Sequence, residues 1–416
     1  MLTKMISASW PLLLGMGILM LGAGLQSSLL GLRGTIENFP TAVTGGVMSC
    51  YYLGYLVGTV LAPRLVAKVG HIRVFAAAAA VASTAVLLQA SWVHPIAWAA
   101  TRLVSGFCFA GIYVVAESWL NDRASRANRG RLFAAYMLVL YIGLGSSQLL
   151  LTLADPRTTA LFMLSSVLIS LAIVPIVISA QQTPEPAVPR TVRYRDLYRN
   201  SPLGVVAVIV AGFVSAILFS MGPVYAQLIG LSTAGVATFM AVSILAGVVT
   251  QYPVGRLSDK TDRRNVIAGV CALVTIVATT IALTQAVLPY GAFLALAAVF
   301  SGFALTIYSL AVSHVNDQLE PADMVAASSA LLLLNGIGAS VGPLICGVLI
   351  GAFGPHAYFA TLATLTGTLT VYDLWRKTRR RSPANKRPFI NAQPQCVTGR
   401  IVENAPPPQA DARLAD

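Results

Sequence analysis

The sequence predicts an all-α membrane protein with twelve transmembrane helices, arranged as two related six-helix bundles. Three observations support this fold class. The 416 residues are 56% hydrophobic and only 10% charged, whereas a soluble domain carries about 25% charged residues. Apolar runs of about 20 residues, long enough to cross a bilayer as helices, recur from end to end. An eleven-residue phrase also occurs twice, once in each half of the chain.

The predicted spans follow one another with short polar breaks, and helix is the conformation that satisfies their backbone groups in lipid. The breaks at His94-Pro95 and Pro289 are the weakest. The twelve ranges are 8–31, 41–63, 73–92, 96–120, 131–153, 158–180, 202–228, 233–255, 265–286, 289–314, 325–350 and 356–375.

The distribution of basic residues predicts the orientation. Of the 28 Lys and Arg, Arg33 and Arg157 lie in loops on one side and Arg102 lies within a span, while the others lie on the side of both termini. Short cytoplasmic loops carry the positive excess, so both termini are expected in the cytoplasm. The formal charge of +13 is therefore interpreted as a topology signal. Attraction to anionic membrane lipid is a secondary effect, and no nucleic-acid partner is expected.

The repeated phrase divides the chain into two equivalent units. IYVVAESWLND at 112–122 and IYSLAVSHVND at 307–317 share six of eleven letters, and they end the fourth and tenth spans. Two bundles related by a parallel repeat are one of the known plans of membrane transporters. The predicted units are an N-terminal bundle 1–180, a cytoplasmic linker 181–201, a C-terminal bundle 202–375, and a basic tail 376–416 that is expected to be disordered.

Two short motifs resemble signatures of the major facilitator superfamily. GRLSDKTDRR at 255–264 is similar to the loop signature of that family, and RLVSG at 102–106 is similar to its Arg-x-x-x-Gly signature. The N-terminal counterpart of the loop, PRLVAKVGHIR at 63–73, has Ala67 where the signature has Asp. The stretch 102–150 further resembles the YcaD-type bacterial subgroup. The residues that fill the loop signature are Gly255, Asp259, Lys260, Arg263 and Arg264, with Asp262 in place of the usual second Gly.

This resemblance implies a monomeric secondary transporter of the bacterial inner membrane. It would move a small organic solute by alternating access between two bundles, linked to protons. A passive facilitator of the same fold and a non-transporting receptor are the alternatives. Sequence signatures of hydrolases, metalloproteases and phosphate loops are missing, so no enzyme activity, cofactor or metal is expected. Neither the substrate nor the direction of transport can be predicted.

Ionisable residues inside the spans are functional candidates, because burying a charge in a membrane costs at least about 2.5–3.5 kcal/mol. Arg102 is expected either to bind an anionic part of the solute or to snorkel toward the headgroups. Glu117 lies at the other end of the same span, among loop cations. The predicted cytoplasmic gate comprises Glu117, Arg131, Lys68, Arg73, Gly255, Asp259, Arg263 and Arg264.

The solute cavity is predicted from neutral polar and aromatic residues in the spans, although any one of them could instead bond to a neighbouring helix. The first and seventh spans hold no ionisable residue in their apolar cores, which leaves Glu117 and His314 as titratable candidates for proton coupling. The predicted cavity residues are Gln26, Arg102, Tyr141, Gln148, Tyr225, Tyr308 and Asn335.

Overall fold

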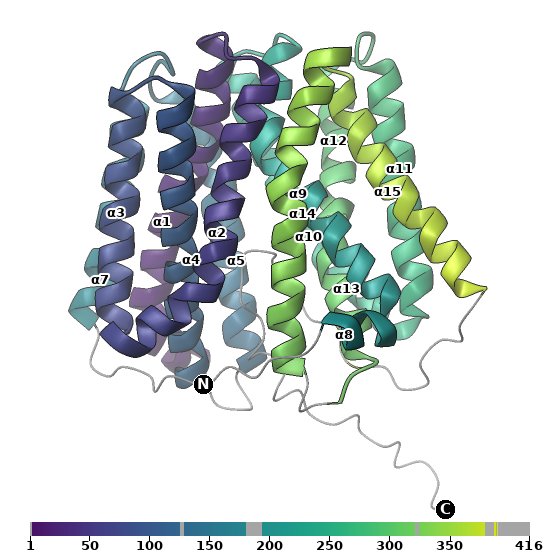
Figure 1. The fold of residues 1–416 in the computed structure, drawn as a ribbon, viewed down its shortest axis with the longest axis horizontal. Helices are drawn as coiled ribbons and strands as arrows, with labels where there is room; N and C mark the ends of the chain where they lie inside the picture. Colours follow the sequence, from purple (N-terminus) through teal and green to yellow (C-terminus); the bar gives the residue numbers. More distant parts are fainter. Residues whose placement is uncertain are drawn as a thin grey trace, which may run out of the picture.

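The computed structural model describes residues 2–124, 129–179, 194–320 and 324–378, together with Arg387 and Phe389. These residues form helices and short connections, without a β-strand among them, and the helices stand side by side in two groups (Figure 1). Residues 181–193 of the predicted linker lie outside the described residues, as does the tail beyond Thr378 apart from Arg387 and Phe389.

The N-terminal half of the chain contributes the first group of helices and the C-terminal half contributes the second. The first comprises α1 (Leu2–Ile36), α2 (Thr41–Val69), α3 (His71–Ser91), α4 (Pro95–Arg123), α5 (Arg129–Ser147), the 3-10 helix η1 (Gln148–Thr152), α6 (Ala160–Leu171) and α7 (Ile173–Ser179). The second comprises α8 (Tyr194–Asn200), α9 (Pro202–Leu228), α10 (Thr233–Lys260), α11 (Arg263–Thr284), α12 (Tyr290–Ala304), α13 (Thr306–Asn316), α14 (Met324–Phe353) and α15 (Ala357–Lys377).

Membrane-spanning length and composition are found in 11 helical segments of the described chain. The helix α15 stands beside them and packs against α11, but it is less apolar and falls outside this set. Twelve spans therefore remain a prediction, while the all-helical membrane fold is confirmed.

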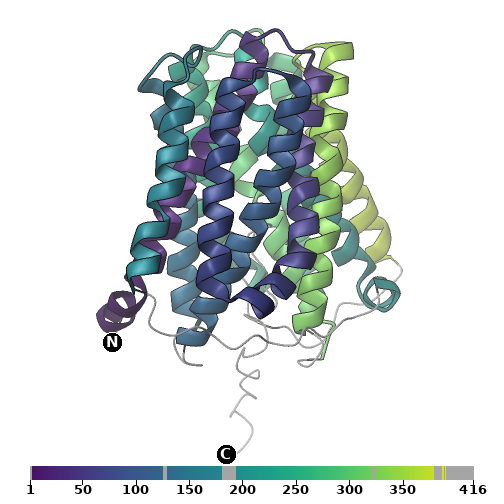
Figure 2. The ribbon, with the colours of Figure 1, turned by 60° about the vertical axis from the view of Figure 1, so that its left-hand side comes forward.

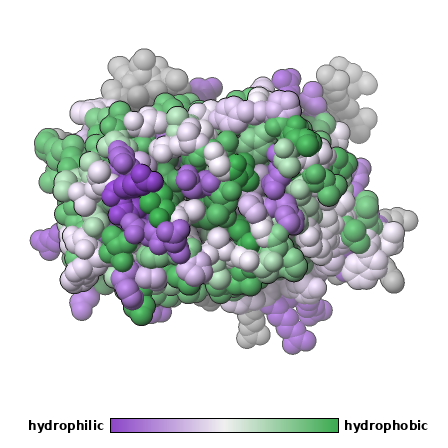
Figure 3. Space-filling model, turned by 90° about the horizontal axis from the view of Figure 1, so that it is seen from above, coloured by the Kyte–Doolittle hydropathy of each residue, from purple (hydrophilic) through white to green (hydrophobic). Residues whose placement is uncertain are grey.

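The two ends of the molecule differ in charge. We call the end that carries the α2–α3 and α10–α11 loops the basic end, because Lys68, Arg73, Lys260 and Arg264 lie there. The start of α1 and the short helix α8 lie at this end, at the bottom of Figures 1 and 2. In Figure 3, the view onto the opposite end, hydrophilic patches lie among hydrophobic side chains.

The internal repeat is visible in equivalent helix contacts. Gly143 of α5 packs against Met20 of α1, and Gly338 of α14 packs against the Ile209 carbonyl of α9. Each glycine belongs to the fifth predicted span of its half, and each contacts the first. Small residues let helix backbones approach closely in membranes, where apolar surface alone gives no preference for a partner. The first and fifth spans therefore pack against each other in both halves of the chain.

Two predicted spans are broken into two α-helices each, and a third, 131–153, passes from α5 into the 3-10 helix η1. The 158–180 span divides into α6 and α7 at Ala172, and the 289–314 span divides into α12 and α13 at Leu305. At the second break, Gln251 Nε2 donates to the Leu305 carbonyl at 3.3 Å and Thr250 Oγ1 donates to the Gly302 carbonyl at 2.6 Å. A side chain from a neighbouring helix can satisfy backbone groups that a bend releases inside a membrane.

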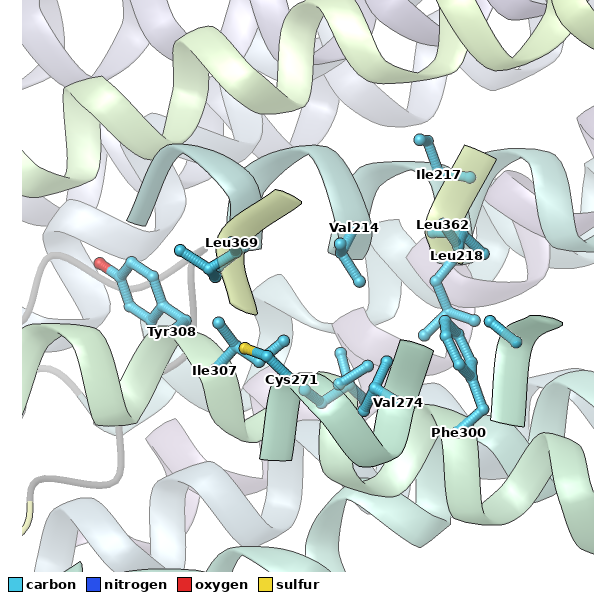
Figure 4. Packing of buried hydrophobic residues seen from close by; sticks show 14 of the residues in the cluster. Val214, Ile217, Leu218, Cys271, Val274, Phe300, Ile307, Tyr308, Leu362 and Leu369 are labelled. Atoms are coloured by element: carbon cyan, nitrogen blue, oxygen red, sulfur yellow. The ribbon is translucent and has the colours of Figure 1, made fainter. Parts of the chain in front are cut away.

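Each half has its own hydrophobic core. The larger cluster is formed mostly by residues from Leu197 to Leu369 and the smaller one mostly by residues from Leu12 to Ile176. In the larger core, Ile307 and Tyr308 of α13 lie among side chains of α9, α11 and α15 (Figure 4). Each bundle is therefore packed mainly around a core of its own.

Candidate functional site

The two bundles are joined in the half of the molecule away from the basic end. Thr41 Oγ1 donates to the Gly347 carbonyl at 2.7 Å, and the Leu344 N–H donates to Ser49 Oγ at 3.1 Å. Gly45 of α2 packs directly on the backbone of α14, which leaves no room for a side chain. These contacts form a seal between α2 and α14 near the end opposite the basic end.

Toward the basic end, one stripe along α10 becomes more exposed. Residues 245, 249, 252 and 256 share a face of the helix because they are spaced by three or four positions. Leu245 packs on Gly145 of α5. Further along, Val249 and Tyr252 are each 72% exposed, and Arg256 is exposed as well. The surface that contacts α5 near the opposite end is therefore uncovered near the basic end.

A cavity of about 50 Å³ lies between the bundles. Its polar lining comes entirely from the N-terminal bundle, whereas Phe219, Met240 and Ile244 of the C-terminal bundle add an apolar wall. The polar lining residues are Gln26, Ser27 and Ser28 on α1, Tyr51 and Tyr52 on α2, Arg102 and Tyr113 on α4, and Gln148 at the start of η1.

Arg102 is the only formal charge in this lining. Its side chain is 2% exposed, and its guanidinium carbon lies 4.4 Å from the centroid of the Tyr51 ring. Within the described part of the chain, its Nε has no hydrogen-bond partner and no carboxylate forms an ion pair with it. A cation over an aromatic face is attracted to the ring, yet the ring does not replace the anion that a buried guanidinium normally pairs with.

Two of the other predicted cavity residues are fixed by hydrogen bonds between helices. Gln26 Nε2 donates to Gln89 Oε1 at 2.9 Å. Gln148 Oε1 accepts from Ser28 Oγ at 2.6 Å, and its Nε2 donates to the Leu144 carbonyl at 3.1 Å. Such bonds hold amide groups in place inside an apolar helix bundle. The structure therefore brings Gln26, Arg102 and Gln148 together in the lining of one cavity.

The remaining predicted cavity residues lie elsewhere. Asn335 lines a second cavity of about 20 Å³ between the bundles and donates to the Val208 carbonyl at 3.0 Å. Tyr141 lies beside Gly247, at the contact of α5 with α10. Tyr225 stacks on Tyr358 at 4.6 Å between ring centroids, within the C-terminal core. Tyr308 lies in that core too (Figure 4). Neither Tyr225 nor Tyr308 contributes to the lining of either cavity.

The predicted gate residues form two groups, one in each bundle. In the C-terminal bundle, Arg263 Nη1 pairs with Asp317 Oδ2 at 2.8 Å and its Nη2 lies 3.4 Å from Asp259 Oδ1. Arg264 lies near Asp262, whose carboxylate accepts from the Arg264 N–H and begins α11.

The N-terminal gate residues lie in the other bundle. Glu117 is 5% exposed near the end of α4, whereas Lys68, Arg73 and Arg131 are exposed at the basic end. The ion pairs of Arg263 stay within the C-terminal bundle. A gate that joins the two groups would belong to a different arrangement of the bundles, so the gate stays a prediction.

Sequence reasoning missed the buried partner of Arg263. Asp317 is the last residue of the repeated phrase, and two basic residues follow the α10–α11 turn. These positions were the available signal for an ion pair between the two segments. Tyr51 and Tyr52 gave a weaker signal, since a Tyr pair within an apolar run does not reveal which ring faces a cavity.

Comparisons with known proteins show which family this chain is similar to. The chain matches the family model of the Major Facilitator Superfamily over residues 12–309 and 245–408. It is 32% identical over 358 residues to an uncharacterized MFS-type transporter YcaD of Escherichia fergusonii, covering 85% of this chain and 92% of that protein. The YcaD protein of Salmonella arizonae is 30% identical over 357 residues, with the same coverage of 85% and 92%.

Solved structures share the fold at low sequence identity. The nucleoside transporter NupG, as a D323A mutant, superposes with a TM-score of 0.76 at 13% identity, covering 88% of this chain and 99% of that chain. A bacterial homolog of the human lysosomal transporter Spinster superposes with a TM-score of 0.67 at 17% identity, covering 89% and 98%. With its two bundles, its loop signature and these relatives, the chain belongs to the Major Facilitator Superfamily of membrane transporters and is similar to its YcaD-type members.

Proposed function

We propose that this chain is a secondary transporter that carries a small organic anion across the bacterial inner membrane by alternating access. The observation that carries the proposal is Arg102, a buried guanidinium in the cavity between the bundles without an anionic partner among the described residues. Burying a charge in a membrane protein is costly, and such residues usually pair with one another or mark a substrate pathway. A carboxylate on the solute would complete the site.

The surroundings of Arg102 favour one compact anionic group with an apolar or aromatic remainder. A guanidinium can donate two parallel hydrogen bonds to a carboxylate, while Phe219 and Met240 on the facing wall suit apolar atoms. Ser220 Oγ donates to Tyr52 Oη at 3.3 Å across the seam between the bundles. A solute bound at Arg102 would therefore contact Tyr52, whose hydrogen bond with Ser220 connects the two bundles.

The described arrangement is interpreted as the state that is open to the cytoplasm. The α2–α14 seal lies at the end opposite the basic end, and the positive-inside rule supports a cytoplasmic basic end. In the other state, the gate residues Glu117 and Asp259 would approach loop cations of the facing bundle. Neutralising Glu117 should then raise the cytoplasmic accessibility of cysteines in the cavity, and unchanged labelling would contradict this role.

Proton coupling is part of the proposal, with a passive facilitator as the second candidate. One observation favours the facilitator, because α9 contains no ionisable side chain apart from Tyr225. Proteoliposomes with and without an imposed pH gradient distinguish the two. Accumulation of the solute against its gradient, only when a pH gradient is present, supports coupling. Equilibration that ignores the pH gradient supports facilitation.

The solute class can be tested without knowing the solute. Purified protein is heated in the presence of a panel of small monocarboxylates and, as matched controls, their uncharged amides. A ligand that binds the folded state raises the melting temperature, by an amount equivalent to about 2.7 kcal/mol at 100 times its Kd. Acids should stabilise the wild type but not Arg102→Met, and amides should stabilise neither. Equal stabilisation by acids and amides would overturn the anion proposal.

A further inference from the structure

The C-terminal tail contacts the basic end of the C-terminal bundle. Arg387 and Phe389 are the described residues of the tail beyond Thr378, and both lie against one cluster that we call the tail slot. The tail slot consists of Gly255 and Asp259 on α10, Arg263 at the start of α11, and Asp317 and Leu319 after α13.

Charged side chains of the tail slot bind the backbone of the tail. The Arg387 N–H donates to Asp317 Oδ1 at 2.8 Å, and the Arg387 carbonyl accepts from Arg263 Nη2 at 2.8 Å. The Phe389 N–H donates to Asp259 Oδ1 at 2.8 Å. Hydrogen bonds in which one partner is ionised are about twice as strong as neutral ones. Three of them in succession fix both the position and the direction of the segment.

The two tail side chains fit the slot as well. Arg387 Nη2 donates to the Leu319 carbonyl at 2.9 Å. The Phe389 ring covers Gly255, where an added Cβ would lie 2.6 Å from the ring. Any residue larger than glycine at this position would displace the ring. The slot therefore accepts a basic residue followed, two positions later, by an aromatic one.

The tail slot is held together by contacts of its own. The side chains of Arg263 and Asp317 are 2% and 3% exposed and lie 2.8 Å apart, and Arg263 Nε donates to Ser258 Oγ at 2.8 Å. The equivalent residue of the first repeated phrase, Asp122, is exposed. Among the described residues the slot is found in the C-terminal bundle, and Asp122 provides a matched control.

The place of the slot gives the tail a means to act on the gate. Gly255 directly precedes Arg256, the last residue of the α10 stripe that faces α5. Around the axis of α10, Gly255 lies between that stripe and the face that carries Ile244, which lines the cavity. When the basic end closes, α5 must approach α10 along this stripe. The Phe389 ring then lies beside the surface that α5 has to cover.

We propose that the segment of Arg387 and Phe389 is a clasp that docks in the tail slot and favours the arrangement open at the basic end. Docking is supported by the hydrogen bonds of Arg387 and Phe389 and by the contact of the Phe389 ring with Gly255. The effect on the gate rests on the alternating access proposed for this chain. Release of the clasp, by a competing partner or by modification of the tail, would then shift the protein toward the state that is closed at the basic end.

Docking is tested by backbone hydrogen exchange, followed by mass spectrometry, on the full-length chain in detergent. The amide of Arg387 should exchange about tenfold more slowly in the wild type than in Asp317→Asn, because Asp317 holds this amide by a charge-assisted hydrogen bond. Asp122→Asn should exchange like the wild type. Phe389→Ala removes the ring without touching the slot and should also exchange fast. Equal exchange in the wild type and Phe389→Ala would overturn docking.

The effect on the gate is tested in the same full-length chain with its native cysteines replaced and Ser27→Cys as a reporter in the cavity. Phe389→Ala should raise labelling by an impermeant maleimide from the side opposite the basic end several-fold, and Asp122→Asn should leave it unchanged. If exchange reveals docking but labelling does not respond, the clasp holds the tail without acting on the gate, and the second half of the proposal is wrong. The melting response to carboxylates tests the transport proposal separately, since it depends on Arg102 rather than the tail.

Discussion

The α2–α14 seal makes a sharp prediction about two adjacent glycines. A Cβ added at Gly45 would collide with the backbone carbonyl of Pro343, and a carbonyl cannot move without shifting the helix. A Cβ added at Gly46 would meet only the Leu344 Cδ1 atom, at 3.8 Å. Gly45→Ala should therefore push α2 and α14 apart, whereas Gly46→Ala, which changes helix propensity equally, should not.

The size of the effect follows from the cost of overpacking. Forcing an extra methyl group into a well-packed contact costs about 1–3 kcal/mol. If the contact exists only in the state sealed at this end, the ratio of the two states shifts by the same free energy, which is about 5- to 150-fold. A transporter needs only a few kcal/mol between its states, so this shift is large enough to reverse the preferred state.

The measurement is directional labelling of Ser27→Cys in a chain without native cysteines. In Gly45→Ala, labelling from the side opposite the basic end should rise and labelling from the basic end should fall. General loosening of the fold would instead raise labelling from both sides. Identical labelling of Gly45→Ala and Gly46→Ala would refute the assignment of this contact as the seal.

Three further predictions concern stability and can be checked by thermal melting of purified protein. Arg102→Met should melt at a higher temperature than the wild type while losing transport, because it removes a buried charge that is unpaired in the absence of solute. Gly106→Ala should melt several degrees lower, since its Cβ would meet the backbone of α2, whereas Gly111→Ala has room and should melt like the wild type. Asp373→Asn should melt higher, because the Asp373 carboxylate is fully buried and its ion pair with Lys377 is long, at 3.8 Å, so the cost of burying the charge outweighs the pairing.

The repeat and the helical spans were predictable because each leaves a pattern in the sequence. Apolar length indicates a span, and repeated letters indicate equivalent helix ends. The amides Gln26 and Gln148 were predictable as cavity residues for a related reason. A polar side chain in an apolar helix has few places where its hydrogen bonds can be satisfied, and the space between bundles is one of them.

The orientation of the tyrosines was not predictable. A soluble helix shows its buried face as an apolar stripe, but a helix between lipid and protein is apolar all round. Nothing in the letters around Tyr225 or Tyr308 distinguishes a face toward the cavity from a face toward the C-terminal core. The contacts of Arg387 and Phe389 were hidden for another reason. They use mainly backbone groups, which every residue but proline carries in full.

The repeated phrase shows how equal letters acquire unequal roles. The sequence draws attention to Glu117 and Val312, where the copies differ. The structure places a further asymmetry at Asp122 and Asp317, where they agree. Asp317 is buried because Arg263 pairs with it.

The N-terminal loop has no guanidinium at the matching place. When the loops PRLVAKVGHIR and GRLSDKTDRR are aligned from Pro63 and Gly255, the counterpart of Arg263 is His71. His71 is buried and lies 3.0 Å from Ser118 Oγ through its Nε2. An arginine has five donors and can bind a carboxylate and a backbone carbonyl at once, whereas a histidine has only two ring nitrogens. This difference between the two loops accompanies the presence of the tail slot in the C-terminal bundle.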